Sequence, residues 1–151
     1  MSIEQGVTRI SIKKSAHELE LLHDARVVAR YRVAIGPGGA GNKRREGDNV
    51  TPVGHYRIVG HQRSQFHIFL RLDYPNADDR LRFEALKASG ELPKSATIGG
   101  DVGIHGAPSR AEWKQDHKKF DWTAGCVAVD DLEIEDIAAR VKDGTPVDID
   151  D

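Results

Sequence analysis

Two residues of the chain have side chains suited to nucleophilic catalysis: its single cysteine, Cys126, and the histidine His105. A thiolate attacks carbonyl carbon, and a neighbouring imidazole accepts the proton that the thiol loses. Gly106 follows the histidine and Gly125 precedes the cysteine, and glycine lets a substrate approach closely and allows nearby N–H groups to face an oxyanion. The two reactive residues lie 21 positions apart, so only the fold can bring them together. The pair predicts catalysis only together with further motifs.

Further short motifs accompany this pair along the chain. In chain order they are 47–54 (GDNVTPVG), 74–76 (YPN), 105–106 (HG), 123–126 (TAGC) and 144–147 (GTPV). Their order and content resemble the catalytic domain of the YkuD-type L,D-transpeptidases, which carries Gly-Asp-x-x-Thr-Pro-x-Gly, His-Gly and [Ser/Thr]-x-Gly-Cys elements. The resemblance extends from about the first strands to the last few residues.

The resemblance implies a reaction and a role for several motif residues. Cys126 is expected to attack a carbonyl of a peptidoglycan stem peptide, so that a terminal D-amino acid leaves and an acyl-thioester remains. His105 is expected to act as general base, with its ring oriented by the Gly106 carbonyl. The backbone N–H groups of Gly125 and Cys126 are candidates for the oxyanion hole, and Thr123 is expected to line the substrate site. The chemistry implied needs neither a metal ion nor an organic cofactor.

One departure from the family pattern concerns the acceptor of the acyl group. Many family members read Gly-Cys-[Ile/Val]-Arg, whereas Ala128 stands two positions after Cys126 in this chain. Arginine binds a carboxylate through a bidentate fork that alanine lacks. We therefore predict that water competes with an amine for the thioester, unless Arg110, Lys114 or Lys118 supplies the missing charge.

Three functions are compatible with these residues. The leading one is an L,D-transpeptidase that passes the acyl group to an amine and so cross-links stem peptides. The second keeps the nucleophile but uses water, as a peptidoglycan amidase or L,D-carboxypeptidase would. The third is a catalytically idle module that binds the cell wall. The intact cysteine and histidine argue against the third, because a binding module needs neither.

Two further residues, Tyr74 and His67, are predicted to bind substrate. Tyr74 belongs to one of the family-like motifs, and His67 is expected near the substrate groove or else facing solvent. His55, His61 and His67 are spaced by six, which would place them on one face of a strand, so a zinc site is the alternative interpretation. We expect no metal site, because Gly60 is predicted to break that strand and no carboxylate is interleaved.

The elements that must position these residues are mainly strands. Hydrophobic patterning predicts strands over 8–14, 18–22, 27–35, 54–61, 64–72, 96–105, 127–129 and 145–149. In the segment 64–72, Phe66 is expected to share one face with Ile68, Leu70 and Leu72. Residues 36–49 are expected to form a surface loop, in which Asp48 shapes the turn into the next strand.

Helix starts are indicated by capping residues: Asn76, Ser109 with Glu112, and Asp130 with Glu133. The first helix is expected to end at residue 88 and the last at the glycine at 144. The predicted fold class is mainly β, a YkuD-like sandwich or partly closed barrel with two or three short helices, in a single domain over residues 1–151.

The composition fits a globular protein and limits its partners. Hydrophobic residues make up 38% of the chain and charged residues 30%, and the formal net charge is −2, which gives no electrostatic basis for binding nucleic acid. The basic residues 43–45 are followed at once by acidic ones and are expected to form a solvated loop. No apolar run reaches the roughly 18 residues that a membrane span requires. The partners that the family resemblance implies are peptidoglycan stem peptides.

The start of the chain is compatible with two compartments. Residues 1–5 lack the basic and apolar regions of a secretory signal, so either the protein acts where it is made or the chain is the mature part of an exported precursor. The family resemblance implies the periplasm or cell envelope. The single cysteine excludes an intrachain disulfide.

Overall fold

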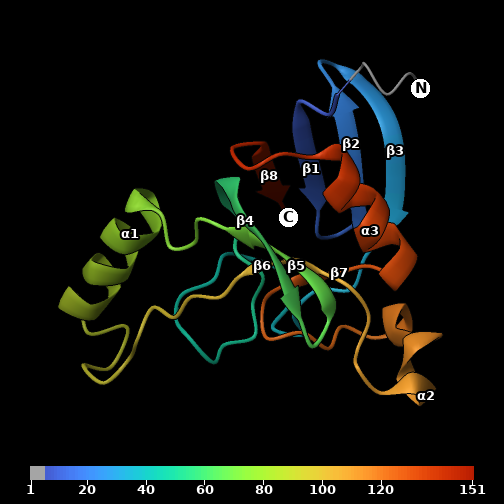
Figure 1. Cartoon of the computed structure of the whole chain (residues 1–151). Coiled ribbons are helices and arrows are strands. Elements are labelled where there is room, and N and C mark those ends of the chain that lie inside the picture. Colours follow the sequence, from blue (N-terminus) through green and yellow to red (C-terminus); the bar gives the residue numbers. More distant parts are fainter. Residues whose placement is uncertain (1–5) are drawn as a thin grey trace.

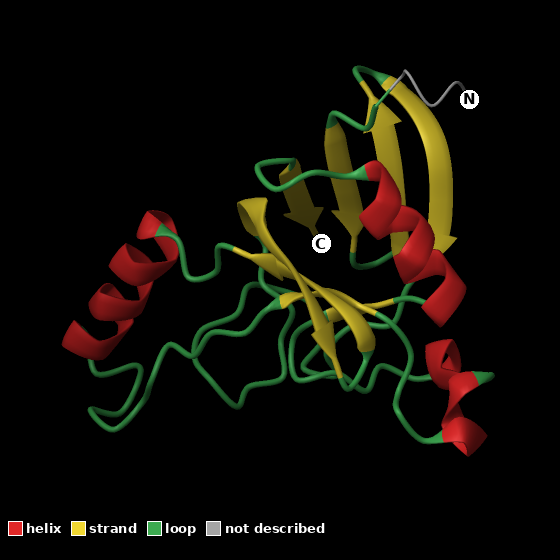
Figure 2. Ribbon diagram, in the orientation of Figure 1, coloured by secondary structure: helices red, strands yellow, loops and turns green. Residues whose placement is uncertain are grey.

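The computed structural model describes residues 6–151, which form one mixed β-sheet and three α-helices (Figures 1 and 2). Residues 1–5, on which the expectation about a secretory signal depends, lie outside the described residues. The strands are β1 (Arg9–Lys13), β2 (Glu18–His23), β3 (Arg26–Arg32), β4 (Gly54–Ser64), β5 (His67–Leu72), β6 (Gly103–His105), β7 (Val127–Ala128) and β8 (Pro146–Asp150). The helices are α1 (Ala77–Ala88), α2 (Ala111–Lys114) and α3 (Asp131–Arg140), with a 3-10 turn at His117–Lys119.

The strand order in the sheet is β3-β2-β1-β8-β4-β5-β6-β7. The pairs β1–β8 and β6–β7 are parallel, and the others are antiparallel. The sheet is not closed, but its two ends meet at one place. There Ala34, which follows β3, and Ala128 of β7 exchange backbone hydrogen bonds of 2.9 and 2.8 Å. The prediction of a mainly β fold with two or three short helices is confirmed, and the eight-stranded sheet is open apart from this bridge.

The core forms because the strands bury alternate side chains, as a period of two requires. In β1, β2 and β8 the buried side chains are Ile10, Ile12, Leu19, Leu21, Val147 and Ile149. The last of these strands, β8, lies between β1 and β4 in the middle of the sheet. Helix α3 adds Ile134 and Ile137 to the same core and packs against β5 and β6. Helix α1 lies on the opposite side of the molecule (Figure 1).

Two of the three predicted helix starts have the expected caps. Asn76 accepts a hydrogen bond from the Asp79 N–H and completes a capping box with the Asp79 side chain at the start of α1. Asp130 and Glu133 form the same arrangement at the start of α3. Ser109 does not cap α2, which begins after Arg110 without a side-chain cap. Helix α3 ends at Arg140 and not at Gly144, which has φ +94° in the following turn.

Several predicted strand boundaries are wrong. Strand β4 continues through Gly60 to Ser64, because its ladder with β5 absorbs a register shift between Ile58 and Gly60. Phe66 lies in the turn between β4 and β5 instead of on the strand face predicted for it. The segment 96–102 is not extended, since Gly99 and Asp101 both have positive φ, and only Gly103–His105 forms a strand.

None of the helices in residues 6–151 is long and apolar enough to cross a membrane.

Candidate active site

The parallel pairing of β6 and β7 brings the predicted nucleophile and base to the same edge of the sheet. Ile104 lies opposite Val127, and His105 lies opposite Ala128. The Val129 N–H donates a hydrogen bond of 2.9 Å to the His105 carbonyl, which extends the pairing by one step. Because Cys126 directly precedes β7, it follows that the cysteine lies beside the strand that ends in His105.

The imidazole of His105 is held in one orientation. The side chain is 1% exposed, and its ring is stacked on Phe66 with 4.2 Å between ring centroids and tilted against Trp122 at 5.6 Å. Its Nδ1 lies 2.8 Å from the Gly106 carbonyl oxygen. Since a carbonyl only accepts, Nδ1 carries the proton, and Nε2 of the neutral ring is left as a proton acceptor.

Gly106 is confined by its neighbours. Its N–H donates to the Phe66 carbonyl at 2.8 Å, and a Cβ at this position would lie 2.5 Å from that oxygen and 2.6 Å from Asp131 Oδ1. Asp131 Oδ1 in turn accepts a hydrogen bond from the Ala107 N–H. Only glycine fits here without displacing the carbonyl that orients the imidazole, which gives a steric reason for the His-Gly sequence.

Burial keeps both reactive groups uncharged at neutral pH. It lowers the pKa of His105 to about 4, although the hydrogen bond to Gly106 opposes the shift. Burial also raises the pKa of the half-buried Cys126 to about 11, against the opposing effects of the Gly103 N–H and the Lys43 ammonium group. The thiol donates a weak hydrogen bond of 3.4 Å to the Asp101 carbonyl. The resting pair is therefore a thiol and a neutral imidazole.

The loop before the cysteine is shaped by Thr123. Its hydroxyl donates to the Cys126 carbonyl at 2.7 Å and accepts from the Gly125 N–H at 3.2 Å. Thr123 is buried, and Gly125 has φ +138°, a conformation that favours glycine. The Gly125 N–H, predicted to face an oxyanion, is thus already engaged by the threonine.

A cavity of about 690 Å³ opens beside the pair and is large enough for part of a peptide. Its lining comes from β4, β5, β6, the β4–β5 turn and the loops that precede β6 and β7: Gln62, Arg63, Ser64, Gln65, Phe66, Phe69, Arg71, Asp101, His105, Trp122, Thr123, Ala124 and Cys126. At the rim, Arg71 pairs with Asp101 at 2.6 Å and lies over the Phe69 ring. Cys126, His105 and Thr123 therefore share one cavity with a cationic side chain.

Comparison with known proteins assigns the family. The model of the YkuD family, the L,D-transpeptidase catalytic domain, matches residues 7–149. The chain belongs to this family.

Solved structures with L,D-transpeptidase-like folds align with nearly the whole chain. The helical cell shape determining protein Pgp2 from Campylobacter jejuni is 22% identical, with a TM-score of 0.70, over 95% of this chain and 47% of that one. Bd1075 from Bdellovibrio bacteriovorus is 20% identical, with a TM-score of 0.63, over 97% and 49%. An L,D-transpeptidase from Mycobacterium smegmatis is 12% identical, with a TM-score of 0.60, over 97% and 59%.

At these identities the likeness concerns the fold, and this chain spans only 47% to 59% of the three solved chains. No match is found among curated proteins.

Two residues predicted to bind substrate lie outside the cavity of this L,D-transpeptidase-family domain. His67 Nε2 lies 2.8 Å from Glu135 Oε1 on α3. Tyr74 is buried, and its hydroxyl donates to the Ile98 carbonyl at 3.0 Å. Neither residue is part of the cavity lining. The partner of each side chain, Glu135 or the Ile98 carbonyl, also lies outside the cavity lining.

The three evenly spaced histidines have separate partners. His55 pairs with Asp148, His61 with Asp143, and His67 with Glu135. Within residues 6–151, no group of three or more histidine, cysteine or acidic side chains is arranged to hold a metal ion.

Ala128, where many family members have arginine, is fully buried and takes part in the bridge to Ala34. An arginine at this position would have to leave the interior or displace its neighbours. Arg110, Lys114 and Lys118, proposed as substitutes, each form ion pairs away from the cavity.

The cationic side chains of the cavity lining are Arg63 and Arg71, which the sequence analysis missed. The one signal for Arg71 in the sequence is its alternation with His67 and Phe69 in the predicted strand 64–72, which places the three side chains on one face.

The lowered pKa of His105 predicts a loss of stability in acid. An exposed histidine has a pKa of about 6.5, so below that pH the unfolded chain binds a proton that the folded protein does not. The free energy of unfolding therefore falls as the pH drops from about 6.5 to 4, and the titration of His105 lowers it by up to about 3 kcal/mol. Urea unfolding at about pH 7 and pH 4.5 measures the loss. The His105→Asn variant has no ionisable group at this position, so its free energy of unfolding should fall less between the two pH values. An equal fall in both proteins would contradict the lowered pKa of His105.

The raised pKa of Cys126 predicts slow alkylation at neutral pH. Because iodoacetamide reacts with the thiolate, the rate should rise about tenfold per pH unit from about pH 7 to 9 and continue to rise beyond about 8.5, the pKa of a free thiol. The urea-unfolded chain is the matched control and should level off near that pH. The single cysteine makes the mass shift unambiguous. A folded-state plateau below pH 8 would instead indicate a thiolate–imidazolium pair.

Proposed function

We propose that the protein is a cysteine-dependent acyltransferase of the L,D-transpeptidase type that acts on peptidoglycan stem peptides. One observation carries the proposal: Cys126 and His105 line the same open cavity, and the Gly106 carbonyl leaves His105 Nε2 as a proton acceptor. A thiol nucleophile and an adjacent base are what acyl transfer through a thioester requires. Family membership supports the same chemistry.

The proposed reaction begins from the neutral pair. The thiol proton moves from Cys126 to His105 Nε2 while sulfur bonds to the substrate carbonyl carbon and the carbonyl electrons move to oxygen. As the tetrahedral species collapses, the imidazolium gives its proton to the departing nitrogen, the carbon–nitrogen bond breaks and a D-amino acid leaves. An acceptor amine then attacks the thioester, gives a proton to His105, and the proton returns to the released sulfur. The cycle ends with a new amide bond and the original thiol.

The developing oxyanion needs donors next to the sulfur. We assign this role first to the Cys126 N–H, because the Gly125 N–H already donates to Thr123 Oγ1 at 3.2 Å. In this proposal Thr123 acts mainly by holding the loop, since both of its hydrogen bonds are within residues 123–126.

Substrate recognition is assigned to the cationic wall of the cavity. Arg71 lies over Phe69 and is paired with Asp101, whose side chain is 86% exposed and can be displaced into solvent. A guanidinium in this position is suited to a stem-peptide carboxylate through a bidentate contact. We propose that Arg71 takes over the role expected of the arginine that Ala128 replaces.

Water is retained as a second acceptor. The cavity is open, so nothing in its described lining excludes water from the thioester. Hydrolysis would make the protein an L,D-carboxypeptidase or amidase and would shorten stem peptides instead of linking them. The likeness to Pgp2, described as a helical cell shape determining protein, is compatible with action in the cell envelope, where we propose that this protein works.

Replacement of the nucleophile tests the enzyme proposal against the idle binding module. A carbapenem acylates a catalytic thiol through its lactam carbonyl, so the wild type should gain the mass of one inhibitor and Cys126→Ala should gain none. His105→Asn should acylate about 10²- to 10⁴-fold more slowly, as loss of a general base predicts. Intact-protein mass spectrometry gives both results, and unchanged circular dichroism serves as the folding control. Acylation of Cys126→Ala would exclude the assigned nucleophile.

Product analysis identifies the acceptor. Purified tetrapeptide muropeptides incubated with the wild type should give a substantial share of hydrolysed tripeptide beside any cross-linked dimer, because the open cavity leaves the thioester accessible to water. Chromatography with mass detection measures the two products, and Cys126→Ala should give neither. A wild type that makes dimer alone would show that water does not compete.

A further inference from the structure

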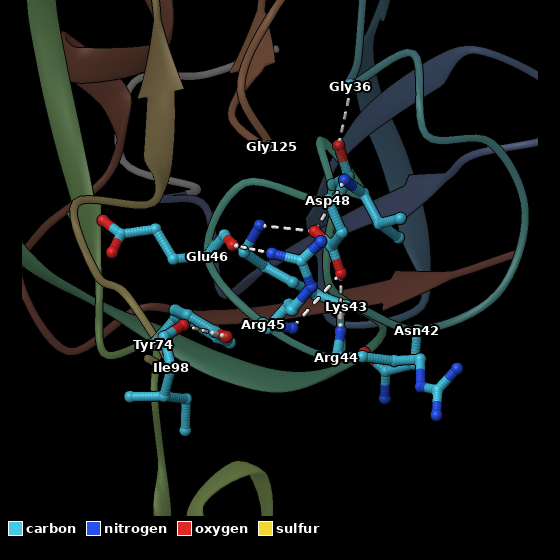
Figure 3. A network of polar contacts seen from close by, with 12 residues as sticks. Gly36, Asn42, Lys43, Arg44, Arg45, Glu46, Asp48, Tyr74, Ile98 and Gly125 are labelled. Carbon is cyan, nitrogen blue, oxygen red and sulfur yellow. Dashed lines mark hydrogen bonds and ion pairs between the residues drawn. The ribbon is translucent and has the colours of Figure 1, made fainter. Parts of the chain in front are cut away.

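A buried lysine lies on the surface loop that the sequence analysis described as solvated. Lys43 is 4% exposed, and its ammonium group is 2.8 Å from Asp48 Oδ1 (Figure 3). Asp48 is itself fixed, since its carboxylate accepts the N–H groups of Arg44, Arg45 and Val50. Burying an ammonium group is costly unless it is paired, and Asp48 supplies the partner that allows Lys43 to lie there.

The ammonium group lies against the backbone that carries the nucleophile. A Cβ placed on Gly125 would be 3.5 Å from Lys43 Nζ and 3.1 Å from the Val50 carbonyl oxygen. Gly125 directly precedes Cys126 in the chain. The charge of Lys43 lowers the pKa of the Cys126 thiol, against the larger effect of burial.

The same loop also contacts the other segment that touches the sulfur. The Glu46 N–H donates to the Thr97 carbonyl at 2.8 Å, and Thr97 Oγ1 donates to Glu46 Oε1 at 2.7 Å. From there the chain leads to Asp101, whose carbonyl accepts the Cys126 thiol proton. Residues 43–48 thus contact both segments that adjoin the Cys126 sulfur: Gly125 on one side and the segment 97–101 on the other.

Other charged groups near the Cys126 sulfur have a weaker electrostatic effect on it. Asp101 and Arg71 act on it with opposite signs, but they pair with each other at 2.6 Å at the cavity rim, where solvent screens them. His105 is neutral at pH 7 because of its lowered pKa. A buried charge acts through a lower effective dielectric constant, which makes Lys43 the stronger cationic influence.

We propose that Lys43, held by Asp48, is a positioning residue for Cys126: it supports the Gly125 backbone and supplies positive charge where sulfur becomes negative. The inference rests on the proposed function to the extent that Cys126 is the nucleophile. It gives the Asp48 turn, expected from sequence to be structural, a part in the chemistry.

The test compares two buried lysines of the same region. In Lys43→Met the charge beside Gly125 is removed. Lys14→Met is the matched control, because Lys14 is 2% exposed and donates to the Gly41 and Thr51 carbonyls at 2.7 Å each, and it is not among the charges that act on the thiol. Both changes weaken the loop 36–53, but only the first removes positive charge near sulfur.

Iodoacetamide alkylation followed by mass spectrometry at about pH 8.5 is the readout. Lys43→Met should react about tenfold more slowly than the wild type, and Lys14→Met should react within about twofold of it, as the local electrostatics predict. Lys43→Arg should retain most of the rate. Should Lys43→Met fail to fold, Lys43→Met combined with Asp48→Asn removes both charges, and the same slow alkylation is expected.

The inference would be overturned if Lys43→Met were alkylated at the wild-type rate. It would also be overturned if the alkylation rate of Lys14→Met fell as much as that of Lys43→Met. Alkylation does not depend on turnover, so failure of the proposed function would appear separately, as a wild type that no carbapenem acylates. If Lys43→Met is alkylated slowly and the wild type is not acylated by a carbapenem, Lys43 still acts on the Cys126 thiol. The proposed acyl transfer is then wrong, and that action has no part in catalysis.

Discussion

The parallel pairing of β6 with β7 is the constraint on which the site depends. These strands are only three and two residues long, and strands so short do not hold a register alone. β5 fixes β6 from one side, and the bridge between Ala34 and Ala128 fixes β7 from the other. A shift of one residue in β7 would move Cys126 away from His105 and turn its side chain to the opposite face.

Burial explains why the site is both well packed and unreactive at rest. Phe66 and Trp122 surround the His105 imidazole, and this environment disfavours the imidazolium as well as the thiolate. Charge separation then becomes favourable only when a substrate carbonyl is present to receive the electrons from sulfur. A cysteine kept as a thiol is also protected from adventitious oxidation, since oxidants react with the thiolate.

The features that follow from local sequence were largely predictable. Alternation of apolar residues located β1 and β2, and capping boxes located the starts of α1 and α3. The segment 96–102 looked like a strand, but contacts with Glu46 and the positive φ of Asp101 are set by the tertiary fold. Motif resemblance indicated Cys126 and His105. It gave no sign of Phe66 or Arg71, which reach the cavity through the β4–β5 turn and the pairing of β5 with β6.

The position of β8 has a consequence for how the protein is made. Residues 146–150 are the last strand along the chain, yet they lie between β1 and β4 and join the two halves of the sheet. A nascent chain on the ribosome can pair β1 with β2 and β4 with β5 early, but the halves stay unjoined until these residues emerge. The sheet is therefore complete only after residues 146–150 have been synthesised, and a chain terminated before residue 146 would be left with two exposed sheet edges prone to aggregate.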